Sequence, residues 1–77
     1  MSRRIVWVVS LEGDACWVFS TKAAAMKAAR QYCKDDRFSR PTRQSARRSQ
    51  GVAEHFFGYT EDGDRFDAAV TPHEVQS

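Results

Sequence analysis

The sequence predicts an α+β domain of ββαββ order, in which a four-stranded antiparallel sheet carries one helix packed on one face. Two turn signals, Glu12-Gly13-Asp14 and Asp62-Gly63, and an alanine-rich amphipathic segment between them support this fold class. The 77 residues allow one domain and leave no room for a second. Residues 1–77 are therefore expected to form a single small domain held by its hydrophobic core.

The first hairpin is predicted from residues 4–11 and 16–20, which are rich in β-branched and aromatic side chains. A two-residue turn at Gly13-Asp14 would pair Leu11 with Cys16 and Val9 with Val18. In that register Trp17 lies on the face opposite Val9. Both faces of the hairpin are apolar, so we expect aromatic side chains to remain exposed where a single helix cannot cover them.

A helix is predicted over residues 22–34, with Ser20 or Thr21 as its N-cap. Alanine is the best helix former, and the segment is rich in it. The small residues Ala25, Ala29 and Cys33 recur every four positions and form one row. We therefore expect the helix backbone to lie close to the sheet along this row.

The second hairpin is predicted from residues 52–60 and 65–70 around the Asp62-Gly63 turn. The expected pairs are Tyr59 with Phe66, Phe57 with Ala68, and His55 with Val70. Pro72 is expected to end the last strand, because proline has no N–H to donate to a sheet ladder.

Residues 35–51 have almost nothing to bury and are predicted to form a basic loop within the domain. Between Lys34 and Gly51 there are six basic and two acidic residues, although the whole chain carries a net charge of only +2. The arginines of this segment are the strongest functional signal in the sequence. They are Arg37, Arg40, Arg43, Arg47 and Arg48.

Three interpretations of these arginines remain open. They could keep a solvated loop soluble, contact nucleic-acid phosphates, or pair with acidic groups on a protein partner. The aromatic residues Trp17 and Phe56 are the other predicted contacts of a partner-binding surface, because aromatic and arginine side chains are enriched at binding hot spots.

No apolar run is long enough to span a bilayer, and none has the form of a signal peptide, so a cytoplasmic protein without membrane contact is expected. Cys16, Cys33, His55 and His73 lack the close spacing of a structural zinc site. We interpret both cysteines as small buried apolar groups. No nucleophile elbow, phosphate loop or metal triad is present, so no catalytic residue, metal, other cofactor or small-molecule substrate is expected.

The chain opens with Ile5-Val6-Trp7-Val8-Val9-Ser10 and continues through Trp17-Val18-Phe19-Ser20-Thr21-Lys22 into the alanine-rich helix. In size, architecture and composition it resembles the small accessory proteins of bacteriophages, and among these the anti-CRISPR proteins. The resemblance implies an inhibitor in the host cell cytoplasm that binds a CRISPR surveillance complex by protein–protein contact and blocks target DNA. A small nucleic-acid-binding regulator that uses the arginine-rich segment is the alternative.

Overall fold

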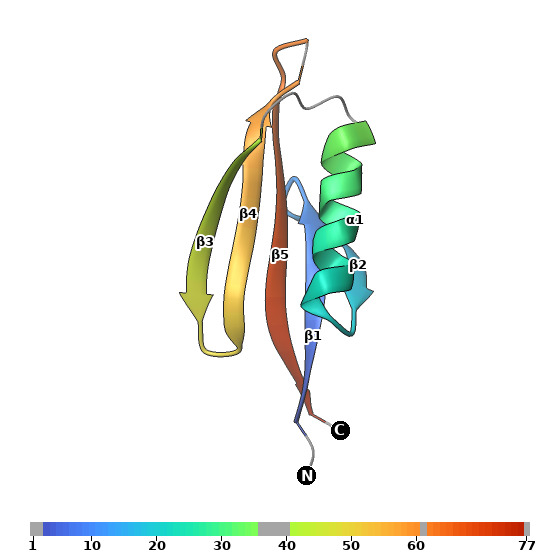
Figure 1. Cartoon of the computed structure of the whole chain (residues 1–77), viewed down its shortest axis with the longest axis vertical. Helices are drawn as coiled ribbons and strands as arrows, with labels where there is room; N and C mark the ends of the chain where they lie inside the picture. The colour runs from blue at the N-terminus through green and yellow to red at the C-terminus, as the bar shows by residue number, and fades with distance from the viewer. Residues whose placement is uncertain (1–2, 36–40, 61, 77) are drawn as a thin grey trace.

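A computed structural model of the chain describes residues 3–35, 41–60 and 62–76. It shows an α+β domain with one helix and a five-stranded antiparallel sheet (Figure 1). The elements are β1 Arg3–Leu11, β2 Asp14–Phe19, α1 Lys22–Asp35, β3 Thr42–Arg48, β4 Gly51–Tyr59 and β5 Arg65–Gln76. The strand order across the sheet is β2-β1-β5-β4-β3.

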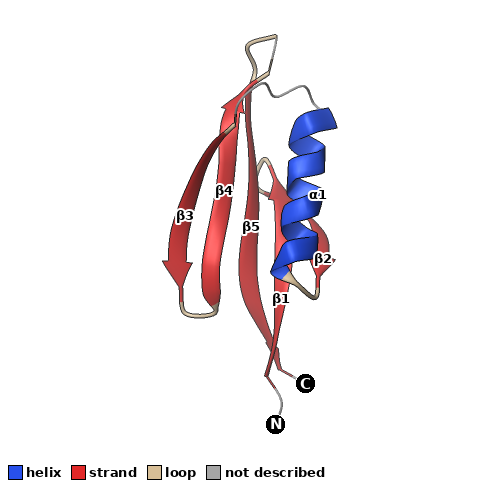
Figure 2. Cartoon of the chain, viewed as in Figure 1, coloured by secondary structure: helices blue, strands red, loops and turns tan. Residues whose placement is uncertain are grey.

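The helix covers only part of one side of the sheet. It packs mainly on β1, β2 and β5, while β3 and β4 lie to one side of it (Figure 2). We call the side of the sheet that carries α1 the helix side, and the opposite side the open face. The helix lies along strands that are distant in sequence and thereby joins the two hairpins in one core.

The core lies between α1 and the centre of the sheet. Val9 of β1 and Val70 of β5 are paired and fully buried. Ala25 and Ala29 of the helix are also fully buried, as the row of small residues predicts. The helix begins at Lys22, and Thr21 caps it, because the Ala24 N–H donates to Thr21 Oγ1 over 3.2 Å.

The segment predicted as a basic loop over residues 35–51 contains the strand β3, so the four-stranded prediction was short by one strand. Residues 36–40 of that segment lie outside the described residues. Strand β3 was missed because it is exposed along its whole length and so shows no apolar alternation. Its backbone pairs with β4 from Thr42–Phe57 to Arg48–Gly51.

The predicted register of the first hairpin was wrong. The turn lies at Glu12-Gly13, both with positive φ, and pairs Leu11 with Asp14. An irregularity near Cys16 then shifts the register, so that Val9 pairs with Trp17. Trp17 therefore lies on the helix side, on the same face as Val9 rather than opposite it.

The second hairpin forms around Asp62-Gly63, but its register was also wrong, by one residue. The last pair is Tyr59–Arg65, and Thr60 N–H donates to the Asp64 carbonyl, which makes the connection longer than a two-residue turn. A slip of one residue exchanges the two faces. Phe56 is consequently on the helix side, while Phe57 and Tyr59 lie on the open face.

Pro72 does not end the last strand, because β5 continues to Gln76 and pairs with β1 along this stretch. The pairing between β4 and β5 begins at Glu54–Val70, so Pro72 lies outside the part of β5 with a strand on both sides. A proline is tolerated there, where its missing N–H interrupts fewer ladder bonds.

Candidate functional site

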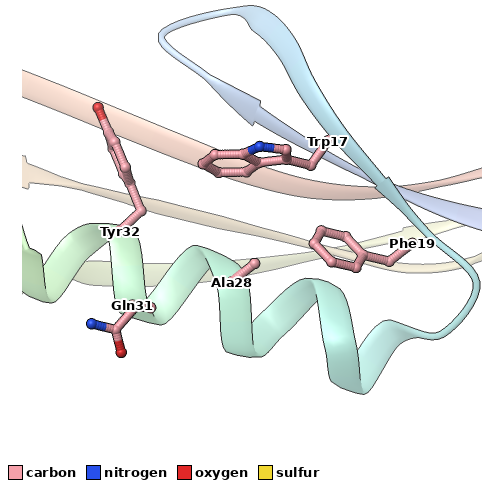
Figure 3. Close-up of a pocket in the computed structure, with 5 residues that line it drawn as sticks. All are labelled: Trp17, Phe19, Ala28, Gln31 and Tyr32. Carbon is pink, nitrogen blue, oxygen red and sulfur yellow. The ribbon is translucent and has the colours of Figure 1, made fainter.

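An apolar cleft lies between α1 and the edge strand β2 (Figure 3). It has a volume of about 270 Å³ and is lined by Trp17, Phe19, Ala28, Gln31 and Tyr32. The two aromatic side chains of β2 point toward the helix, whereas the Gln31 amide points away from them. The register shift near Cys16 creates this cleft, because it turns Trp17 toward the helix.

The cleft is the outer end of a row of aromatic rings. The Tyr32 ring is stacked on the buried Phe66 ring at a centroid distance of 4.9 Å. Trp17 meets the Tyr32 ring edge-on at 6.4 Å and keeps 43% of its surface exposed. A tryptophan that is partly packed and partly exposed can contact a partner with little further loss of side-chain freedom.

The strand that carries Trp17 is also an edge of the sheet. Cys16 and Val18 are exposed on it, and Val18 keeps 65% of its surface accessible. The other edge, β3, carries Arg43, Arg47 and Arg48. Charged side chains protect an edge strand from pairing with other chains, so β2 is the less protected edge of the two.

A buried carboxylate joins the helix to β3 and β4. Glu54 of β4 is 3% exposed and accepts hydrogen bonds from Arg43 Nε at 3.0 Å, from Lys22 Nζ at 3.3 Å and from the Ser45 hydroxyl. The bonds from Arg43 and Ser45 hold the pKa of Glu54 at about 2, against an ordinary value of 4.5. The hydrogen bond to Glu54 and the negative charge of its carboxylate raise the pKa of Arg43.

This cluster gives Arg43 a structural role. The Lys22 ammonium also lies 5.4 Å from the centroid of the Trp7 ring, which ties the first turn of the helix to β1. The sequence carries a signal for this cluster, because Glu54 is an acid in the middle of a mostly apolar strand. Such a residue is buried only when cationic or hydrogen-bonding partners surround it.

The predicted contact residues do not form one surface. Arg43 and Arg47 face the helix side of β3, and Arg48 faces the open face. Trp17 lies at the opposite edge, four strand spacings away, or roughly 19 Å. Arg37 and Arg40 lie outside the described residues.

Phe56 is not an exposed contact, because its side chain is 5% accessible and belongs to the hydrophobic core. The one-residue difference in the register of the second hairpin explains the correction. Tyr59, at 67% exposure, is the aromatic side chain of β4 most available to a partner.

Cys33 is buried as expected, but Cys16 is exposed on β2. Among the residues that the structure describes, no group of three or more His, Cys, Asp or Glu side chains is placed to hold a metal ion. No helix in the described ranges is long and apolar enough to cross a membrane.

Comparisons with protein-family models, with curated proteins and with solved structures found no match to this chain. The interpretation of the cleft therefore depends on its own geometry.

Proposed function

We propose that this chain is a binding protein that acts by protein–protein contact through the cleft between β2 and α1. The observation that carries the proposal is the half-exposed Trp17 beside an apolar cleft on an edge strand. Tryptophan and tyrosine are the residue types most enriched at binding hot spots, and both line this cleft.

The edge strand supports a protein partner over a small ligand. Its outer backbone groups are those that an extended partner segment would pair with, as in binding by strand addition. A large apolar side chain of that segment would then enter the cleft beside Trp17. Backbone pairing would supply affinity, and the cleft would supply specificity.

We further propose that the partner is a CRISPR surveillance complex and that the chain is an inhibitor of the anti-CRISPR kind, as its size and architecture suggest. The net charge of +2 argues against an inhibitor that imitates DNA, since such imitation needs a dense negative charge. Steric blocking of a target-DNA surface by a small bound protein fits this charge better.

The test is a competition experiment with a purified surveillance complex. The wild-type chain should co-elute with the complex in size-exclusion chromatography and abolish its shift of labelled target DNA. Trp17→Ala should weaken the inhibition at least tenfold, because the loss of a hot-spot side chain costs about 2 kcal/mol or more.

Tyr59→Ala is the matched control, because it removes a more exposed aromatic ring from the opposite face of the sheet. It should inhibit as the wild type does. Co-elution unchanged by Trp17→Ala would remove the cleft from the interface, and absence of any complex would refute the proposed partner.

A further inference from the structure

The open face of the sheet carries a row of rings along β4. His55, Phe57 and Tyr59 alternate with inward-facing residues and so project to the same side. The His55 and Phe57 rings lie 5.3 Å apart, and Tyr59 continues the row toward the hairpin tip with most of its surface exposed. His55 and Phe57 are in ring contact, and Tyr59 extends the aromatic surface by one further position along the strand, about 6.8 Å away.

A shallow floor of small residues continues this row toward the other end of β4. Ala46 and Ala53 are paired across β3 and β4, and Ala69 is paired with His55. The cavity over this floor has a volume of about 350 Å³ and is also lined by Gln44, Arg48 and Thr71. Its floor fits a flat ring, and its walls carry hydrogen-bond donors.

A second cavity of about 490 Å³ shares Arg48 and Thr71 with the first and extends to Gln50 and His73. Glu74 also lines its far end, which makes that end the less favourable one for an anion. The two cavities and the rings of β4 thus form one track along the open face.

The charge of this face is positive among the described residues. Arg4, Arg48 and Arg65 project to it from the strands, while Asp67 also projects there and Glu74 lines the second cavity. Asp67 lies 4.0 Å from His55 Nε2, so its charge is directed at an imidazole rather than at an arginine. A second copy of the chain would bring the same cationic face against this one, and the like charges would oppose the contact.

We propose that the open face binds single-stranded nucleic acid, with bases stacked on Phe57 and Tyr59 and phosphates directed to Arg48 and Arg65. Exposed rings on a sheet, flanked by arginines, provide the two interactions that such binding requires: stacking and neutralisation of the backbone. Bases can stack on exposed protein rings only when they are unpaired, so single strands are the preferred form. Of the arginines predicted as contacts, Arg48 lies on this face, whereas Arg43 and Arg47 face the helix side.

The experiment measures fluorescence anisotropy of labelled oligouridine, oligodeoxythymidine and a DNA duplex with the purified chain. Both single strands should bind more tightly than the duplex, and their affinity should fall as salt is raised. Tyr59→Ala should weaken single-strand binding at least fivefold, as the loss of one stacked base does. Arg48→Ala should make the salt dependence shallower by about one counterion.

Trp17→Ala is the matched control and should bind single strands as the wild type does. Tighter binding of oligouridine than of oligodeoxythymidine would assign the site to RNA. Equal binding of the two would mean that the site accepts single-stranded RNA and single-stranded DNA alike. Equal affinity for the duplex, or affinity unchanged by Tyr59→Ala in a variant that melts as the wild type does, would overturn the proposal. So would loss of the surveillance-complex interaction in Tyr59→Ala, which would make the open face a protein surface.

Discussion

Glu54 shows how one side chain can hold three elements, α1, β3 and β4, in position relative to one another. Its carboxylate is buried and bound by groups from α1 and β3, while its backbone belongs to β4. A buried charge is tolerated only when its partners are in place, so the position of β3 beside β4 depends on this cluster as well as on backbone pairing.

The first prediction concerns the charge of Glu54. Glu54→Gln keeps the shape of the side chain but removes the charge from its hydrogen bonds, which should destabilise the fold by about 2 kcal/mol. Chemical denaturation of the two proteins measures the difference. Glu12→Gln provides a control with an exposed carboxylate in the first hairpin turn and should change stability much less.

The second prediction concerns pH. The pKa of Glu54 is about 2 in the fold against an ordinary 4.5, so its stabilising contribution is complete above pH 4.5 and is lost as the pH falls toward 2. The stability of the wild type should therefore decrease through this window more steeply than that of Glu54→Gln. Parallel slopes for the two proteins, measured by denaturation at several pH values, would show that Glu54 has an ordinary pKa.

A third prediction at this scale separates Arg43 from Arg47, which lie on the same face of β3. Arg43→Ala should lower the melting temperature, because it removes the guanidinium that donates to the buried Glu54 carboxylate. Arg47→Ala should leave the melting temperature close to that of the wild type, since no ion pair of Arg47 is present among the described residues. Equal effects of the two substitutions would mean that general charge, and not the Glu54 cluster, sets stability.

At the scale of elements, the sequence predicts those with a strong local signal. The helix follows from its alanines and its Thr21 cap, and four of the strands follow from β-branched and aromatic runs. Strand β3 could not be found in this way, because an edge strand exposed on both faces has no alternation of apolar and polar residues. It is held by backbone pairing with β4 and by the ion pair with Glu54, which are tertiary contacts. Both hairpin registers failed because they depend on turn and bulge geometry, which a dipeptide signal does not specify.

The same limits explain what could be predicted of the candidate sites. Trp17 was expected as a contact, but its face changed with the bulge near Cys16. Tyr59 was expected to pair with Phe66 but pairs with Arg65 on the open face, since the one-residue slip exchanged it with Phe56. An error of one residue in register therefore leaves the fold class intact and exchanges the surface with the core.

The fourth prediction concerns the helix face. Ala29 is fully buried in the row of small residues, and Ala29→Leu should destabilise the fold by roughly 1–3 kcal/mol through overpacking. Ala23→Leu is the matched control, because Ala23 is exposed on the same helix and the same change there adds no volume to the core. Thermal melting of the two variants distinguishes a buried row from a general effect of leucine in this helix.

At the scale of the whole molecule, the two proposed surfaces lie on opposite sides of one sheet. The cleft is at the β2 edge on the helix side, and the ring track runs along β4 on the open face. Among the described residues, the two most exposed aromatic side chains are Trp17 and Tyr59, and one belongs to each of these places. The pair of substitutions Trp17→Ala and Tyr59→Ala therefore tests each surface against the other.

The last prediction concerns the two edges of the sheet. Strand β2 presents Cys16, Trp17 and Val18 at its edge without a neighbouring lysine or arginine, and an unprotected apolar edge promotes pairing between copies. Without a partner, the chain should therefore self-associate through β2 as its concentration rises. Val18→Lys should reduce this association in sedimentation experiments with a reductant present, which keeps the exposed Cys16 from cross-linking.

Gln44→Lys adds the same charge to the β3 edge, which already carries arginines, and should leave the association almost unchanged. If both variants reduce it equally, net charge controls association; only a selective effect of Val18→Lys assigns it to the β2 edge.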